Sequence, residues 1–244
     1  MTWFLEHADV VGRLAVQHAY LAGVPLLIGL VLALPLGWLA QRGGPWRPIL
    51  LTGTGLLYTI PSLALFVLIP LVLGTRILDP VNVLVAMTIY TIALLVRSVA
   101  DGLASVPAET AAAATAMGYG GWRRLVAVEL PLAIPVIAAG LRVAAVSNVS
   151  IVSVASLIGV AQLGSLLTDG YQRFYGEVLL VGIAACVVLA LLFDVVIVGV
   201  TRLLTPWARA GRGAAPGSGP GSHAGSSAGS GAGSGGGPRA GGAA

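Results

Sequence analysis

The sequence contains no lysine, a single cysteine and few charges of either sign, since only 9% of its 244 residues are charged. A soluble domain carries about 25% charged residues, so the composition argues against one. With 57% hydrophobic residues and a mean hydropathy of +0.95, the chain is predicted to be an integral membrane protein. The single thiol, Cys186, excludes a disulfide within the chain, and its apolar neighbours predict a small buried hydrophobic residue.

These absences also exclude most catalytic and cofactor-binding functions. Without lysine the chain cannot contain the glycine-rich phosphate-binding loop, so any ATP that drives it must be hydrolysed by a partner. His7, His18 and His223 do not have the spacing of a metal site. The sequence has no HExxH motif, paired carboxylates or Ser–His constellation, so we expect neither an enzyme nor a bound cofactor. The net charge of +4 comes from arginines scattered at segment ends, which indicates membrane topology and not nucleic-acid binding.

Long apolar runs predict an all-α polytopic membrane protein with about five transmembrane helices and a re-entrant segment. The first run would span about 30 Å as a helix, which matches the thickness of a bilayer core. Prolines inside these runs predict kinks, which neighbouring helices can tolerate. The five predicted spans are residues 20–39, 49–73, 81–99, 132–149 and 178–200.

The stretch between the fourth and fifth spans, residues 150–168, is too polar and too rich in glycine to face lipid comfortably. We therefore predict a short or re-entrant segment that packs inside protein. Its polar and glycine residues are Ser150, Ser153, Ser156, Gly159, Gln162, Gly164 and Ser165.

The second span bends at a polar centre made of Thr59, Pro61 and Ser62. On one interpretation these residues form a wall of a translocation path. On the other they are an ordinary proline kink whose hydroxyl groups bond to local carbonyls. The sequence leaves both interpretations open.

A charge lies inside the fourth span at Arg142. A charge at membrane depth is costly, so its side chain should face protein or water. Arg142 either lines the path or pairs with an acid such as Asp194, or its long side chain reaches the cytoplasmic surface. Asn148, at the end of this span, and Ser153 complete the set of candidate path residues.

The two ends of the chain differ from the membrane domain at residues 19–206. Residues 1–18 are predicted to form an extracytoplasmic segment, folded as a short amphipathic surface helix. They lack the basic start and short apolar core of a cleaved signal peptide. Residues 207–244 are almost entirely Gly, Ser, Ala and Pro, which predicts a disordered tail.

The distribution of arginine predicts the orientation. With five spans and the N-terminus outside, eight of the arginines up to residue 212 lie on the cytoplasmic side and three on the outer side; a full crossing by residues 150–168 would change this to six and five. Because arginine is enriched in cytoplasmic loops, five spans are favoured. The cytoplasmic set is Arg42, Arg47, Arg97, Arg123, Arg124, Arg202, Arg209 and Arg212, and the outer set is Arg13, Arg76 and Arg173.

The loop at residues 101–131 is the only long and fairly polar break between apolar segments. Pro107 and Glu109 suit the start of a helix, and Gly118 can close it in the left-handed conformation. Five of the seven residues from Ala108 to Ala114 are alanine, which gives a smooth surface that could fit a groove of another protein. A second short helix should follow at an angle and meet Leu130 and Pro131.

This loop resembles the cytoplasmic loop of bacterial ABC import permeases, which reads Glu-Ala-Ala, three residues, Gly, nine residues, Ile, one residue, Leu-Pro. The chain departs from the pattern at the glutamate, where it has Ala112, and at the isoleucine, where it has Val128. The nearest acid, Glu109, lies one helical turn earlier. The residues that match the pattern are Ala113, Ala114, Gly118, Leu130 and Pro131.

Further segments resemble the osmoprotectant branch of that family, whose members import glycine betaine, carnitine or choline. These segments are residues 59–65, 129–137 and 140–142. Methionine importers share the loop and also have sequence similar to residues 170–174. The resemblance implies a methionine-importer-like type I ABC permease fold in the inner membrane of a bacterium.

The resemblance also implies partners. Cytosolic ATP-binding subunits would grip the loop through Glu109, Ala112, Ala113, Ala114, Gly118, Leu130 and Pro131. A second permease subunit, identical or not, would complete the path through the bilayer, and an extracytoplasmic solute-binding protein would deliver the solute. Import of methionine or another amino acid is the nearest alternative. An ion-driven secondary transporter is a different class, but it would show repeats and several acids at mid-membrane, where only Asp194 lies well inside a span.

Overall fold

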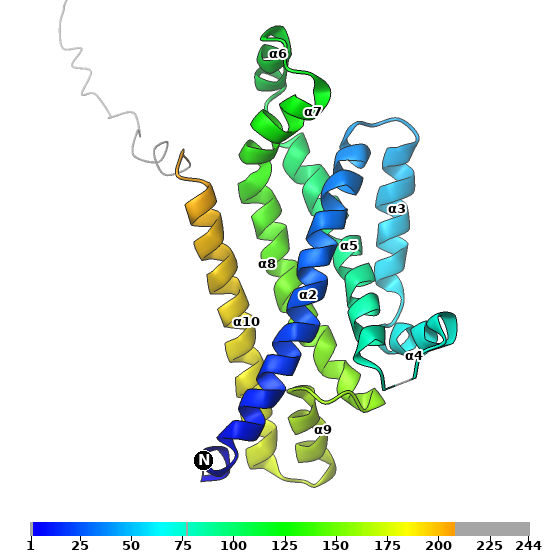
Figure 1. Cartoon of the computed structure of the whole chain (residues 1–244), viewed down its shortest axis with the longest axis vertical. Coiled ribbons are helices and arrows are strands. Elements are labelled where there is room, and N and C mark those ends of the chain that lie inside the picture. The colour runs from blue at the N-terminus through cyan, green and yellow to red at the C-terminus, as the bar shows by residue number, and fades with distance from the viewer. Residues whose placement is uncertain (1, 77, 208–244) are drawn as a thin grey trace, which may run out of the picture.

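The computed structural model describes residues 2–76 and 78–207, in which all regular structure is helical. The helices form an elongated bundle with α6 and α7 at one end, hereafter the α6 end, and with α9, α4 and the N-terminus at the other, the α9 end (Figure 1). The helices are α1 (Thr2–Glu6), α2 (Ala8–Gln41), α3 (Trp46–Thr59), α4 (Ser62–Leu73), α5 (Pro80–Ala104), α6 (Ala108–Ala116), α7 (Gly121–Arg124), α8 (Leu130–Val154), α9 (Gly164–Gln172) and α10 (Gly176–Leu204).

Four helical stretches in the described residues are long and apolar enough to cross a membrane. They are Ala8–Gln41, Pro80–Ala104, Gly121–Ile158 and Gly176–Leu204. Helices α3 and α4 pass the same test only as a pair, and they are bent by 101° at the break between them. The number of spans is therefore four, or five if the bent pair is counted, as the all-α polytopic prediction requires.

The first span is longer than predicted. Helix α2 begins at Ala8 and runs without a break past Pro25 and Pro35 to Gln41. Residues 8–18, expected as part of a separate surface helix, are thus the first turns of this long helix, and only α1 stands apart. Buried Pro25 is tolerated because surrounding helices hold the chain in place where one backbone hydrogen bond is missing.

Helix α2 packs most extensively against α5, and small residues make this possible. Gly29, Ala33 and Gly37 lie four residues apart on one buried face of α2. A Cβ atom on Gly37 would lie 2.6 Å from Cβ of Val99 in α5, and one on Gly29 would lie 2.5 Å from a methyl group of Thr91. Small residues at this spacing let two helix backbones approach closely, which is a common basis of helix association in membranes.

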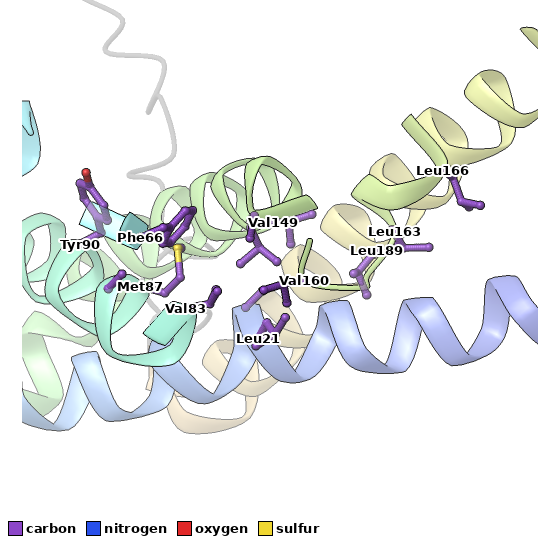
Figure 2. Close-up of a cluster of buried hydrophobic side chains, with 14 of the residues drawn as sticks. Leu21, Phe66, Val83, Met87, Tyr90, Val149, Val160, Leu163, Leu166 and Leu189 are labelled. Atoms are coloured by element: carbon purple, nitrogen blue, oxygen red, sulfur yellow. The ribbon is translucent and has the colours of Figure 1, made fainter. Parts of the chain in front are cut away.

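Two apolar clusters fill the bundle. The cluster toward the α9 end joins α2, α4, α5, α8, α9 and α10, and Figure 2 shows Leu21, Phe66, Met87 and Val149 within it. The second cluster joins α2, α5, α8 and α10 around Leu95 toward the α6 end. Large apolar side chains elsewhere on α4 and α10 are exposed, as expected for surfaces that face lipid.

The glycine- and serine-rich stretch reverses the chain at the α9 end, as the sequence predicts. Helix α8 ends at Val154, a 3-10 turn follows at Ala155–Ile158, and Gly159 has φ +87°. Short helix α9 then packs against α10, which returns to the α6 end (Figure 1). The second half of the segment therefore does not form another crossing helix.

The turn between α2 and α3, helices α6 and α7, and the last residues of α10 all lie at the α6 end (Figure 1). This is the grouping that the arginine distribution predicts. The predicted tail lies outside the described residues except for Trp207, and so do Arg209 and Arg212.

Candidate functional site

Helix α6 begins directly after Pro107 and ends in a Schellman motif. Gly118 has φ +85°, its N–H donates to the Thr115 carbonyl at 2.9 Å, and the Tyr119 N–H donates to the Ala114 carbonyl at 3.1 Å. Gly118 is needed here because a side chain disfavours the left-handed conformation. The helix therefore has a defined end, followed by a turn containing Gly120 and Gly121.

Helix α6 protrudes from the bundle (Figure 1), and its alanine-rich sequence gives it a smooth surface. Ala114 is the buried residue of this helix, whereas Glu109, Ala112 and Ala113 are exposed. Gly118 is exposed as well. An alanine-faced helix of this kind can enter a complementary groove without the loss of side-chain rotamers.

The predicted second short helix is not separate. Helix α7 continues through a π-helical turn at Leu125–Glu129 directly into α8, so that Gly121–Ile158 is one helical stretch. The reason lies in Pro131, which has no N–H and whose ring would clash with the carbonyl four residues earlier in a regular helix. A wider π-turn just before the proline relieves that clash, and π-turns are frequent at functional sites.

Aromatic contacts connect this loop to the end of α2. Trp38 packs edge-on against Trp122 with their ring centroids 5.8 Å apart, and the guanidinium of Arg42 lies 3.7 Å from the Trp38 ring centroid. Arg123 sits 5.0 Å from the ring centroid of Tyr119. The Trp38–Trp122 contact thus braces the loop against the end of α2, whereas the Arg123–Tyr119 contact lies within the loop.

The bend between α3 and α4 lies where the sequence predicts a polar centre. The Thr59 hydroxyl donates to the Leu56 carbonyl at 2.7 Å, as in an ordinary kink. The Tyr90 hydroxyl of α5 donates to the Ile60 carbonyl, which the helix break leaves without its usual partner. Pro61 is exposed and Ser62 is half-buried, so the surface of the bend remains accessible.

Arg142 and Asp194 form a bidentate ion pair between α8 and α10. Nε of Arg142 donates to Oδ1 of Asp194 at 2.5 Å, and Nη2 donates to Oδ2 at 2.9 Å. The two side chains are 48% and 26% exposed, although both lie well inside apolar helices. The structure thus forms the pairing that the sequence offers as one interpretation of Arg142.

Asn148 lies at the centre of the bundle and joins three helices. Its side chain is fully buried, and its Nδ2 donates to the Thr91 hydroxyl at 2.9 Å and to the Ala22 carbonyl at 3.2 Å. Ser153 is half-buried, and its hydroxyl donates to the Ser150 carbonyl at 2.6 Å. Asn148 therefore has no surface open to a solute in this conformation.

A second buried polar hub was not predicted from the sequence. His18 lies within hydrogen-bond distance of Gln162 Oε1, at 2.8 Å, and of the Val149 carbonyl, at 3.0 Å. Gln162 Nε2 in turn donates to the Val152 carbonyl at 3.0 Å. The signal was a histidine and a glutamine in otherwise apolar or glycine-rich surroundings, but nothing local indicated that they would meet.

Two cavities open at the α9 end. The larger, about 390 Å³, is lined by Trp3, Ser165, Asp169, Arg173 and Tyr175 together with apolar side chains. None of the predicted path residues lines either cavity. Within residues 2–76 and 78–207, no three His, Cys, Asp or Glu side chains could together hold a metal ion.

Comparison with known proteins identifies the family. Residues 26–210 match the family described as the binding-protein-dependent transport system inner membrane component. The chain is 33% identical over 208 residues to the osmoprotectant import permease OsmW of Salmonella typhimurium, which covers 84% of this chain and 96% of OsmW. It is 27% identical to the glycine betaine/carnitine/choline permease OpuCB of Bacillus subtilis, which covers 78% of this chain and 86% of OpuCB.

The fold is also that of a solved permease. A chain of the inward-facing MetNI methionine ABC transporter matches with a TM-score of 0.74 over 82% of this chain and 98% of its own length, at 20% identity. This likeness confirms the type I permease fold that the loop implied. The protein therefore belongs to the family of inner-membrane components of binding-protein-dependent transport systems, and it is a transport permease and not an enzyme.

Proposed function

We propose that the chain forms one half of the membrane path of an ABC importer for a small osmoprotectant such as glycine betaine, carnitine or choline. The observation that carries this proposal is the 33% identity to OsmW over nearly the full length of that permease. Further relatives from Bacillus subtilis are named for the transport of glycine betaine, carnitine or choline.

The α6 end faces the cytoplasm and carries the contact with the ATP-binding subunits. Within the described residues, six arginines of the predicted cytoplasmic set lie toward this end, against three toward the α9 end, which supports the orientation. The contact surface consists of Glu109, Ala112, Ala113 and Gly118. Ala114 is buried and packs α6 against the rest of the protein. Leu130 and Pro131 set the angle at which α8 leaves the loop.

Closure of the ATP-binding subunits would move α6, and the spans attached to it would rotate between outward and inward arrangements. Such coupling needs a rigid connection between the gripped helix and the spans. The continuous helix from α7 into α8 supports this account because it carries motion from α7 into the membrane without a joint.

The path is completed by a second permease subunit, either a copy of this chain or a sister chain. The bend at Thr59, Pro61 and Ser62 is accessible, and Arg142 with Asp194 presents exposed charge inside the membrane, so these groups suit a water-filled path between two halves. Ser153 lies further along the same helix as Arg142. Asn148 contributes by holding α8 against α2 and α5. A solute-binding protein would dock at the α9 end.

Import of methionine or another amino acid is the alternative. It rests on the similarity to the MetNI chain, but at 20% identity that similarity concerns the fold. The relatives named for osmoprotectants therefore favour the first proposal.

The test is competition for uptake in vesicles that contain this chain with the ATP-binding subunit and binding protein of its own system. Labelled glycine betaine would be supplied with an excess of unlabelled choline, carnitine or methionine. We expect choline or carnitine to reduce the uptake and methionine to leave it unchanged. Uptake of labelled methionine, with none of glycine betaine, would instead assign the amino-acid alternative.

A further inference from the structure

The loop at the α6 end contains a buried carboxylate that the family pattern leaves without a role. Glu129 ends the π-turn, and its side chain is only 8% exposed. A buried carboxylate is costly unless it is paired and hydrogen-bonded. Its partner is Arg124, whose Nε donates to Oε1 of Glu129 at 2.6 Å.

The π-turn is what brings these two residues together. They are five positions apart, and in a regular α-helix five positions place side chains roughly 140° apart around the axis. In the turn at Leu125–Glu129, the Leu130 N–H bonds to the Leu125 carbonyl, five residues earlier. This wider turn places position 129 nearly above position 124, so that the guanidinium reaches the carboxylate.

The same guanidinium also reaches back to α6. Nη1 of Arg124 donates to the Thr115 hydroxyl at 2.9 Å, and that hydroxyl lies 2.9 Å from the Ala111 carbonyl, to which it donates. Arg124 therefore joins α6 to the base of α8 with two different donors of one planar group. Lysine, with a single amine, could not hold both partners in this geometry.

The covalent connection between α6 and α8 is weak by comparison. Three of the four residues from Gly118 to Gly121 are glycine, and glycine is the most flexible residue. Helix α6 itself buries only Ala114. A force applied to α6 thus has few stiff routes into the membrane, and the link through Arg124 is one of them.

We propose that the Thr115–Arg124–Glu129 link makes α6 and α8 move as one body, and that it sets how much transport each ATP hydrolysed produces. Arg124 and Glu129 are positioning residues in this role. The inference rests on the proposed function, because the load on α6 is attributed to the ATP-binding subunits. Thr115, Arg124 and Glu129 are the side chains through which that force would reach the spans.

The rigidity can be tested on the purified chain without partners. Spin labels would be attached at cysteines introduced by Ala112→Cys in α6 and Val136→Cys in α8, after Cys186→Ala removes the native thiol. We expect one narrow distance distribution for the parent and broader ones for Arg124→Lys, Glu129→Gln and Thr115→Val. Thr115→Val leaves the buried ion pair intact, so it tests the link even if the other variants fold poorly.

The chain offers a matched control beside Arg124. Arg123 carries the same charge but stacks on Tyr119, so Arg123→Gln removes a cation from the same turn without touching the link. This variant should keep the parent distribution. Equal broadening in the control, or no broadening in any variant, would overturn the proposed link.

The second readout is the ratio of solute uptake to ATP hydrolysis in vesicles with the ATP-binding subunit and binding protein. We expect hydrolysis to continue in Thr115→Val and Arg124→Lys while uptake per ATP falls several-fold, and the control to keep the parent ratio. Broader distributions with an unchanged ratio would overturn the coupling role. If the parent itself shows no ATP-dependent uptake, the proposed function fails, and the spin-label distances still decide whether the link is rigid.

Discussion

At the scale of single residues, the polar side chains inside the bundle are joined across helices. Asn148 connects α8 to α2 and α5 through Ala22 and Thr91, and His18 connects α2 to the α8–α9 reversal through Gln162. In an apolar interior these bonds fix the helices in one register because alternative arrangements would leave polar groups unpaired.

Replacement of Asn148 by alanine should lower the stability of the bundle. The change removes hydrogen bonds of 2.9 and 3.2 Å and leaves the buried Thr91 hydroxyl without one partner. Interhelical hydrogen bonds in membranes contribute about 0.5–2 kcal/mol, so the melting temperature in detergent should fall measurably. Ser147→Ala, one position earlier and half-buried, is the control. Equal melting temperatures for the two variants would contradict the role of Asn148.

The ion pair of Arg142 and Asp194 predicts a specific rank order of variants. Arg142→Met alone leaves a carboxylate unpaired inside the membrane, and Asp194→Leu alone leaves a guanidinium unpaired. Removing one partner of an ion pair inside the membrane leaves the other charge unpaired and costs more than removing both. The double variant should therefore reach the membrane in larger amounts and melt at a higher temperature than either single variant. Additive losses in the double variant would show that the two groups do not interact.

How much the sequence reveals differs between these residues. The cost of a charge at membrane depth was enough to nominate Asp194 as a partner for Arg142, because few acids lie inside the spans. The sequence shows that Asn148 is polar, but it does not show that the side chain is buried. Asn148 was therefore included among the candidate path residues. The pairing of His18 with Gln162 joins positions 144 residues apart, and no local pattern predicts such a contact.

At the scale of elements, the close packing of α2 against α5 depends on residues without side chains. Gly37→Ala should destabilise the bundle, because its Cβ would lie 2.6 Å from Cβ and a methyl group of Val99. Overpacking of a tight contact costs about 1–3 kcal/mol. The measurement is thermal unfolding of the purified chain in detergent.

A matched control for Gly37 is available on α3. A Cβ on Gly53 would meet nothing within 4 Å, so Gly53→Ala should leave stability unchanged or raise it by up to about 1 kcal/mol, since alanine favours helix. If both variants unfold at the same temperature, the account of the α2–α5 contact is wrong.

Element types were predictable where apolar runs were long, and element ends were not. Nothing in residues 8–18 breaks a helix, so α2 continues through them although their polarity suggested a surface segment. The sequence predicts a short helix that meets Pro131 and a separate span from residue 132, whereas the clash of Pro131 with the preceding turn produces a π-turn inside one continuous helix. The serine and glycine content of residues 150–168 did predict the reversal, because those residues cannot sustain a lipid-facing span.

At the scale of the whole molecule, the bundle separates two kinds of surface. One end presents the protruding helix α6, and the other presents the chain reversal (Figure 1). Helix α6 is rich in alanine, and two cavities open at the end with the reversal. The composition could predict a membrane protein and its number of spans, because hydropathy reports burial in lipid. It could not predict which solute crosses, because the sequence shows no aromatic cage for a quaternary ammonium group.

The central claim is that ATP hydrolysed by a partner drives this permease through α6. The most direct test is uptake of labelled glycine betaine by vesicles containing the chain, its ATP-binding subunit and its binding protein, with and without ATP. Gly118→Val would break the left-handed end of α6, because a β-branched residue strongly disfavours φ +85°. Gly120→Ala, in the same turn but with φ −66° and open space around its Cβ, is the control.

The account predicts uptake that requires ATP, falls several-fold in Gly118→Val and persists in Gly120→Ala. Uptake that proceeds equally without ATP and in Gly118→Val would contradict it and indicate an ion-driven transporter.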